Sequence, residues 1–130
     1  MIVLDTHAWW WTVSEPDQLS PKARQVISRT HPEQRAIVSI SIWEFAMMVT
    51  RGRVELSISP EEWLDHAINE TGITVLHMNS KIALESRNLP GDFHKDPADR
   101  IIVAATRVSR SKLITKDQKI IDYPHVTTIW

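Results

Sequence analysis

Acidic residues stand next to the short apolar runs of this chain, and an expected parallel sheet would bring them together. Asp5 directly follows the first apolar run, and Asp117 directly follows the fourth. Glu44 lies in the first turn of the helix expected after the second run, while Asp96 and Asp99 open the helix before the fourth. Sites in open α/β sheets form outside the carboxyl ends of the strands. We therefore expect these carboxylates to gather at that edge.

Several carboxylates at one edge repel one another unless a cation holds them. Two like charges about 4 Å apart cost roughly 4 kcal/mol at an effective dielectric of about 20. Oxygen ligands in a chain without cysteine suit Mg²⁺, with Mn²⁺ as a substitute. Mg²⁺ binds through one or two carboxylates and keeps waters, which leaves positions for a phosphodiester. The chemistry that such a cluster serves is metal-assisted hydrolysis, with the acids as ligands and as general base for the attacking water.

Each acid taken alone also has a structural explanation. Glu44 completes a capping box with Ser41, and Asp96 is a good helix N-cap. Asp99 favours the dipole at the start of its helix, and Asp117 is suited to begin a turn or helix. The carboxylate after the first strand is the hardest to explain in this way, because an acid that ends a buried strand needs a partner. The set as a whole is harder to explain by helix capping than any one member.

The elements that must position these acids alternate along the chain. Short apolar runs bounded by polar residues are typical of buried strands, and Ser, Asn or Asp followed by a first helical turn, often with Pro, marks the helix starts. The expected strands are 1–4, 36–40, 73–77, 112–115 and 126–130, and the expected helices with their caps are 20–29, 41–50, 59–72, 79–88 and 96–110. Alternation of this kind predicts an α/β fold with a mostly parallel sheet and helices on both faces.

Composition limits the class of protein further. The chain has 130 residues, 15 Lys and Arg against 16 Asp and Glu, a formal net charge of -1, and no cysteine. That length suits one domain spanning 1–130, and the missing cysteine excludes disulfides, zinc–thiolate sites and thiol nucleophiles. The balanced charge argues against a wholly basic nucleic-acid surface but permits a local basic patch. Without a signal-peptide pattern or a membrane-length apolar run, we expect a cytoplasmic protein.

Two other enzyme classes also place an Asp after the first strand. A phosphatase of haloacid-dehalogenase type needs a second Asp two residues further on, where this chain has His7. A receiver domain needs its phosphorylated Asp after the third strand, where His77 stands. Only three glycines occur, and none forms a glycine-rich phosphate loop. These departures disfavour both alternatives.

Four segments carry a resemblance that covers essentially the whole chain. They are Leu4-Asp5-Thr6-His7, Ser41-Ile42-Trp43-Glu44, the run from His94 to Ala105 with its Asp96-Pro97-Ala98-Asp99-Arg100 core, and Leu113-Ile114-Thr115-Lys116-Asp117. With these segments the chain resembles PIN-domain ribonucleases, specifically toxins of the VapC type. Ala98 stands where many relatives carry Phe, but none of the pattern's acids is missing. The resemblance implies a PIN-like three-layer α/β/α sandwich with a five-stranded parallel sheet.

The same resemblance implies an activity and partners. It implies Mg²⁺-dependent endonucleolytic cleavage of RNA, often tRNA or rRNA, together with homodimerisation and inhibition by a cognate antitoxin. The metal-binding acids would be Asp5, Glu44, Asp99 and Asp117. Asp96 would cap its helix or assist through water, and Thr115 would orient a water or the metal.

Basic and aromatic residues suggest contacts around this site. Arg100 and Lys116, near the carboxyl edge, are candidates for holding RNA phosphates. Trp9, Trp10 and Trp11 are consecutive, so on a helix they cannot all face one core. Besides a core or dimer role, they suggest an aromatic surface for an antitoxin helix or for base stacking, and we favour the protein partner. The alternative to an enzyme is a non-catalytic PIN-like module that binds a protein through this Trp-rich surface.

Overall fold

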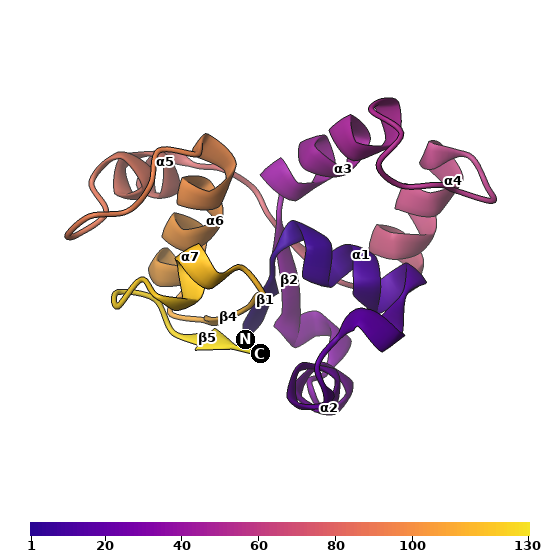
Figure 1. Ribbon diagram of the computed structural model, residues 1–130, viewed down its shortest axis with the longest axis horizontal. Helices are drawn as coiled ribbons and strands as arrows, with labels where there is room; N and C mark the ends of the chain where they lie inside the picture. The colour runs from indigo at the N-terminus through magenta and orange to yellow at the C-terminus, as the bar shows by residue number, and fades with distance from the viewer.

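The computed structural model describes all 130 residues and contains a five-stranded sheet in which every strand pair is parallel (Figure 1). The strand order is β3-β2-β1-β4-β5. The strands are β1 (Ile2–Leu4), β2 (Arg35–Val38), β3 (Thr74–Leu76), β4 (Lys112–Ile114) and β5 (Thr128–Ile129). β1 is central, so the carboxyl ends of β2 and β4 flank the point where it ends. The predicted parallel α/β sheet is confirmed.

The register between the central strands sets which side chains meet at the carboxyl edge. Leu4 of β1 aligns with Ile114 of β4, and the Asp5 N–H donates to the Ile114 carbonyl at 3.1 Å. The residues after these strands, Asp5 and Thr115, therefore emerge side by side. This pairing places the first acid of the chain next to the segment that leads to Asp117.

Helices connect the strands and begin where local capping predicts. The α-helices are α1 (Thr6–Ser14), α2 (Pro21–Arg29), α3 (Ile40–Thr50), α4 (Pro60–Leu64), α5 (Ser80–Arg87), α6 (Pro97–Val108) and α7 (Gln118–Ile121), with short 3₁₀ turns at Pro16–Gln18 (η1) and Pro32–Gln34 (η2). The side chains of Ser20, Ser59, Asn79 and Asp96 each accept from the N–H three residues on, at 2.9–3.1 Å. Each of these bonds satisfies a backbone donor that the first helical turn leaves unpaired.

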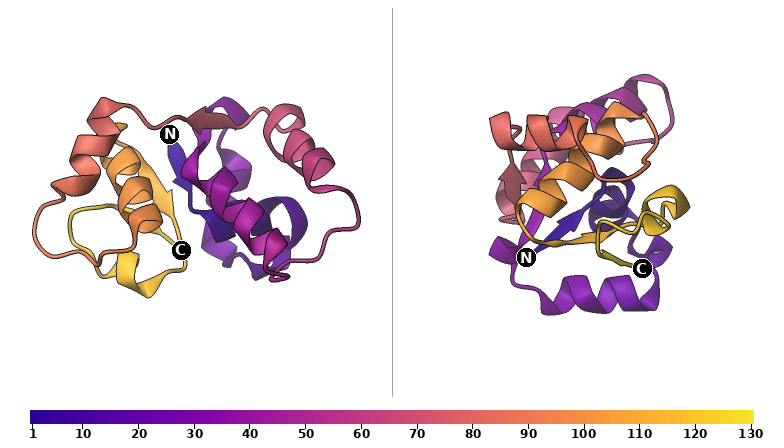
Figure 2. Two further views of the ribbon diagram at one scale, coloured as in Figure 1. Left: turned by 90° about the horizontal axis from the view of Figure 1, so that it is seen from above. Right: turned by 90° about the vertical axis from the view of Figure 1, so that its left-hand side faces the viewer.

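The sheet separates two hydrophobic cores. Along β1 the side chains of Ile2 and Leu4 belong to one core and that of Val3 to the other, because successive residues of a strand face opposite sides. The first core packs against α1, α2, α3 and α4, and the second against α5, α6 and α7. In the view from above, α5 and α6 lie on one side and α1 with α3 and α4 on the other (Figure 2). The result is a three-layer α/β/α sandwich.

The start of α3 corrects one prediction. The helix begins at Ile40 after Ser39, so β2 ends at Val38 rather than at residue 40. Ser41 therefore lies inside the helix, and its hydroxyl pairs with Thr6 instead of capping the chain. The predicted capping box between Ser41 and Glu44 does not form, because both side chains contact Thr6 of α1 instead.

Two helices differ in detail from their predicted forms. The helix that begins at Pro60 is α-helical only to Leu64 and continues as a π-helix, η3, over Asp65–Glu70. The helix after Asp96 ends at Val108, because Arg110 adopts a left-handed backbone with φ 53°. Neither difference moves an acid away from the carboxyl edge.

Three of the six tryptophans build core, whereas Trp43 on α3 is 58% exposed. Trp9, Trp10 and Trp63 are 1%, 6% and 4% exposed, and Trp63 stacks on Phe45 with ring centroids 4.2 Å apart. Trp11 is partly buried. The core role considered for the 9–11 run is therefore confirmed for Trp9 and Trp10, because packing against α3 and α4 covers their rings.

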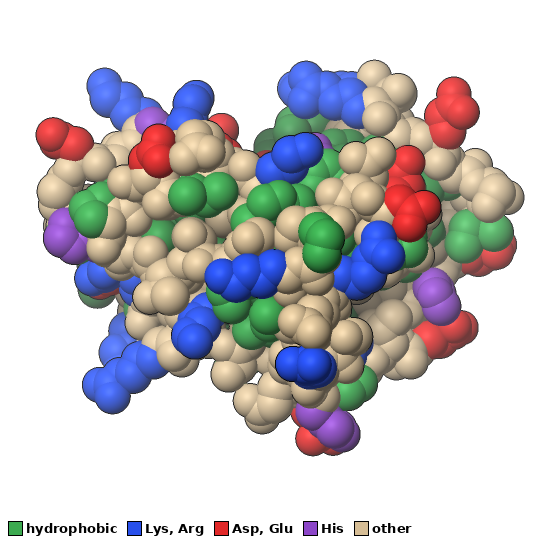
Figure 3. Space-filling model, turned by 60° about the horizontal axis from the view of Figure 1, so that its bottom comes forward, with side chains coloured by type: hydrophobic (Ala, Val, Ile, Leu, Met, Phe, Trp, Pro, Cys, Tyr) green, Lys and Arg blue, Asp and Glu red, His purple; other side chains and the backbone are tan.

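Charged side chains are spread over the surface. On the face shown in Figure 3, Lys and Arg side chains extend over the centre and lower left, and acidic ones lie toward the right edge and the upper left. This mixture agrees with the net charge of -1. None of the helices combines the length and apolar character that crossing a membrane requires.

Candidate active site

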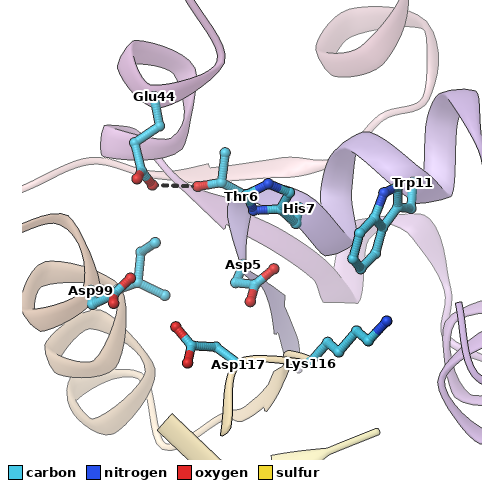
Figure 4. Close-up of a pocket in the computed structure, with 9 residues that line it drawn as sticks. Asp5, Thr6, His7, Trp11, Glu44, Asp99, Lys116 and Asp117 are labelled. Atoms are coloured by element: carbon cyan, nitrogen blue, oxygen red, sulfur yellow. Dashed lines mark hydrogen bonds between the residues drawn. The ribbon is translucent and has the colours of Figure 1, made fainter. Parts of the chain in front are cut away.

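A cavity of about 510 Å³ opens at the carboxyl edge of the sheet, and four of the predicted acids line it (Figure 4). We call it the acidic cavity. Its lining consists of Asp5, Thr6, His7, Trp11, Glu44, Asp99, Ile102, Lys116 and Asp117. The acids come from the end of β1, from α3, from the first turn of α6 and from the segment after β4. The juxtaposition expected from parallel strands is therefore what the structure has.

Asp5 stands at the junction of β1 and α1 with both carboxylate oxygens oriented. Oδ1 accepts from the Ala8 N–H at 2.8 Å and so caps α1, while Oδ2 accepts from the Thr115 hydroxyl. Thr115 Oγ1 in turn accepts from the Asp117 N–H at 3.1 Å. Thr115 is fully buried, so this hydroxyl fixes Asp5 and the start of the Asp117 segment together.

Glu44 reaches the cavity from α3 and is held by α1. Thr6 Oγ1 donates to Glu44 Oε1 at 2.5 Å and lies 2.9 Å from Ser41 Oγ. Both hydroxyl residues are buried, with exposures of 5% for Thr6 and 0% for Ser41. Thr6 and Ser41 were not singled out by the sequence as supports of Glu44. The signal available was a polar pair, directly after Asp5 and three residues before Glu44, in otherwise apolar surroundings.

Asp99 enters the cavity from the first turn of α6. Its Oδ2 lies 3.0 Å from His94 Nε2, although the direction of approach does not make a hydrogen bond. Asp96, by contrast, is exposed and caps α6 by accepting from the Asp99 N–H at 3.0 Å. Asp96 does not line the cavity, so the structure gives it the capping role and Asp99 the place facing the other acids.

Asp117 and Lys116 complete the cavity on the β4 side. Asp117 Oδ1 accepts from the Lys119 N–H at 2.9 Å and caps the short helix α7, which leaves Oδ2 without a protein partner. The Lys116 ammonium lies over the ring of Trp11, 5.7 Å from its centroid. In Figure 4 the carboxyl groups of Asp5, Asp99 and Asp117 surround a common space, with Lys116 and Trp11 to one side.

Three carboxylates of the cavity, those of Asp5, Glu44 and Asp99, hold their protons more tightly than free acids. Burial raises the pKa of Asp5 and the pKa of Glu44. The hydrogen bond from Thr115 to Asp5 and that from Thr6 to Glu44 lower these pKa values, but by less than burial raises them. Burial, and then repulsion from Asp96 and Asp117, raises the pKa of Asp99 to about 7. At each of the three acids repulsion from neighbouring carboxylates adds to the effect of burial, whereas His7 lowers the pKa of Asp5 and of Glu44.

The donor set fits a hard divalent cation. As the side chains stand, no three His, Asp or Glu residues are arranged to hold an ion directly. Mg²⁺ does not need such a cage, because it binds through one or two carboxylates and keeps several waters. Oxygen donors alone, without cysteine, and mutually raised pKa values are what a site for Mg²⁺ or Mn²⁺ would show before the ion neutralises it.

The guanidinium of Arg100 forms hydrogen bonds within the protein. Its guanidinium donates to the carbonyls of Ser86, Phe93 and His94 at 2.9, 3.0 and 3.2 Å, which ties α6 to α5 and to the segment between them. It does not line the acidic cavity. The expectation that Arg100 holds an RNA phosphate is therefore corrected to a structural role, and Lys116 is the one Lys or Arg that lines the cavity.

The fold and the site together define the class of protein. The PIN domain family model matches residues 2–126, and the chain belongs to the PIN domain family. Ribonuclease VapC22 of Mycobacterium tuberculosis is 30% identical over 131 residues, which cover 99% of this chain and 98% of that protein. The family that the sequence motifs predict is therefore confirmed.

Solved structures share the fold at lower identity. VapBC2 from Rickettsia felis, bound to a DNA fragment of its promoter, aligns with a TM-score of 0.71 at 15% identity over 99% of this chain and 98% of that one. DNA-bound VapBC from Salmonella typhimurium gives 0.71 at 16% identity, covering 98% and 96%. A toxin–antitoxin complex from Klebsiella pneumoniae gives 0.67 at 18% identity, covering 100% and 97%.

Proposed function

We propose that this chain is a Mg²⁺-dependent endoribonuclease that acts as the toxin of a toxin–antitoxin pair. The observation that carries the proposal is the convergence of Asp5, Glu44, Asp99 and Asp117 on one cavity. The one Lys or Arg in the lining, Lys116, lies over the Trp11 ring. Membership of the PIN domain family and the likeness to a VapC ribonuclease over almost its full length support it.

The chain's own residues would divide the work of phosphodiester hydrolysis. Asp5, Asp99 and Asp117 would hold the cation together with Glu44, and a bound Mg²⁺ or Mn²⁺ would supply Lewis-acid polarisation of the phosphodiester. Thr115 and Thr6 hold Asp5 and Glu44 by hydrogen bonds and so set the orientation of these two acids. Carboxylate oxygens without a protein partner, such as Glu44 Oε2 and Asp117 Oδ2, are available to accept a proton from the attacking water.

The test of this proposal is RNA cleavage by the purified protein with Mg²⁺, with Mn²⁺ and with EDTA. Wild type is compared with Asp5→Asn, which keeps the shape and the capping capacity of Asp5 but removes its charge. Asp92→Asn is the matched control, because Asp92 is exposed and lies outside the cavity. We expect metal-dependent cleavage by wild type and Asp92→Asn only. Equal cleavage by Asp5→Asn, or cleavage that persists in EDTA, contradicts the proposal.

The proposal includes an antitoxin, an RNA substrate and a second copy of the chain. A cognate antitoxin is expected to cover the acidic cavity, and tRNA or rRNA is expected as the substrate. We also propose a homodimer, because large apolar side chains are left exposed on α3 (Trp43, 58%), after β3 (Met78, 46%) and on α5 (Leu84, 65%). Light scattering of wild type and Trp43→Glu tests the dimer, and a monomeric wild type contradicts it.

A further inference from the structure

Trp11 is the one tryptophan of the 9–11 run that reaches the acidic cavity. Trp9 and Trp10 are buried in the first core. The Trp10 indole N–H also donates a hydrogen bond to Glu15 Oε2 at 2.9 Å. Trp11 is only partly buried and lines the same cavity as the four acids. An aromatic ring in a cavity of carboxylates is not needed to hold a cation, so it calls for a separate explanation.

No aromatic ring of the protein is stacked on Trp11. Its aromatic neighbours, His7 and Trp130, have centroids 5.6 and 5.9 Å away and are tilted by 52° and 51°, so neither is stacked on it. Trp63, buried in the core, is by contrast stacked on Phe45 at 15°. The ammonium of the exposed Lys116 lies over the Trp11 ring, 5.7 Å from the centroid. That distance is at the outer limit of a cation–π contact.

We propose that Trp11 stacks on a nucleobase of the RNA next to the scissile phosphate, with Lys116 contacting the adjoining backbone. This inference rests on the proposed function. Sites for single-stranded nucleic acid combine aromatic rings with cations in this way, since a ring binds any base face and an ammonium binds the phosphate. Here both groups stand on the rim of the cavity where the phosphodiester would be cut (Figure 4).

The lining favours a nucleotide over a protein helix at this spot. A docking helix buries a stripe of apolar side chains, but Trp11 and Ile102 are the apolar side chains of the cavity. The remaining lining is acidic, hydroxylic or cationic. The single Trp11 ring beside the Lys116 ammonium is suited to one nucleobase and the phosphate next to it. This revises the preference for a protein partner that the Trp run alone suggested.

The experiment pairs a change in the protein with a change in the RNA. The bond that wild type cuts is first mapped, and a 20-nucleotide RNA spanning it is made intact and with an abasic residue on either side of that bond. Affinity is measured in EDTA by fluorescence anisotropy for wild type, Trp11→Leu and Trp11→Phe. Trp11→Leu keeps an apolar side chain without a ring, and Trp11→Phe keeps a ring.

We expect Trp11→Leu to weaken binding of the intact RNA about ten-fold, within the range for one lost base stack, and Trp11→Phe to retain most of the affinity. One of the two abasic RNAs should bind wild type about ten-fold more weakly than the intact RNA does. The affinity for that RNA should not fall further in Trp11→Leu. In cleavage assays Trp11→Leu should raise KM about ten-fold with kcat within about two-fold. Lys116→Gln should lower the salt dependence of binding.

Two results would overturn the stacking proposal. One is an equal loss for Trp11→Leu on intact and abasic RNA, because that identifies a general packing defect. The other is unchanged RNA affinity of Trp11→Leu, and if the same variant also loses antitoxin binding, the ring is assigned to the protein partner. If wild type cuts no RNA with Mg²⁺ or Mn²⁺, the proposed function itself fails. Cleavage without coupling between Trp11 and the base overturns the stacking alone.

Discussion

The hydroxyl of Thr6 donates to Glu44 Oε1 at 2.5 Å and so joins the first residue of α1 to the side of α3. Thr6 directly follows Asp5, which means that one short segment both supplies an acid of the cavity and holds another. The bond also favours the charged form of Glu44, because a hydrogen bond to the carboxylate lowers its pKa against the effect of burial.

Thr6→Val should loosen Glu44 while keeping the shape of the side chain. The change leaves Glu44 and the buried Ser41 without their shared partner, which costs about 1–3 kcal/mol of the free energy of unfolding. We expect RNA cleavage to fall about ten-fold or more, as for other residues that orient a metal-binding acid. Urea unfolding and cleavage rates at saturating Mg²⁺ measure the two effects. Thr6→Ser, which keeps the hydroxyl, should behave nearly as wild type, and an equal loss in both variants contradicts this role.

The metal-free protein should lose stability as pH rises through the neutral range. The pKa of Asp99 is about 7 in the folded chain against 3.8 for a free Asp, so between these values the folded chain binds a proton that the unfolded chain has released. The free energy of unfolding therefore falls as pH increases across this window. Asp5 and Glu44 act in the same direction, because their pKa values are also raised.

Urea unfolding in EDTA at pH 5.5, 6.5 and 7.5 measures this slope. Asp99→Asn should flatten the slope and stabilise the metal-free protein most at the highest pH. Asp92→Asn, which removes an exposed charge, should leave the slope as in wild type. A metal-free protein whose stability rises over this range, with no difference between wild type and Asp99→Asn, would contradict a raised pKa for Asp99.

Binding of Mg²⁺ should release a proton at slightly acidic pH. Because Asp99 is largely protonated below about pH 7 in the metal-free state, the ion must displace that proton to bind. Calorimetric titration at pH 6.5 in two buffers with different ionisation enthalpies counts the released protons. We expect about three-quarters of a proton from Asp99 at pH 6.5 and almost none at pH 8.5, and less release from Asp99→Asn. Release that does not change with pH would place the ion elsewhere.

The sheet and the gathering of acids were predictable because both depend on local signals. Short apolar runs mark β1 and β4, and the caps at Asn79 and Asp96 are bonds to the N–H three residues on. Once the strands are parallel, their carboxyl ends share an edge, and the positions of Asp5 and Asp117 follow from the order of the chain.

The support of the site was not predictable, because it depends on contacts between distant segments. The segment Ser39-Ile40-Ser41-Ile42 offers two serines that are equally suited to begin a helix, and the bond between Ser41 and Thr6 decides between them. Which indole of the 9–11 run stays open depends likewise on packing against Phe45 and Trp63. Arg100 next to Asp99 suggested a phosphate contact, but carbonyls that only the folded chain brings near take up its guanidinium.

Thr115→Val should weaken the metal site by removing a hydroxyl that orients two of its acids, Asp5 and Asp117. The Thr115 hydroxyl donates to Asp5 Oδ2 and accepts from the Asp117 N–H, and its bond lowers the pKa of Asp5. Valine has the same shape without the hydroxyl, so the pKa of Asp5 should rise further and its orientation should relax. We expect Mg²⁺ affinity and RNA cleavage to fall about 10- to 100-fold, with Thr115→Ser close to wild type. Calorimetry and cleavage assays measure both, and raising the pH should restore part of the Thr115→Val loss, because deprotonated Asp5 binds the ion. A loss that is the same at every pH would instead assign Thr115 to the packing of the β4 end alone.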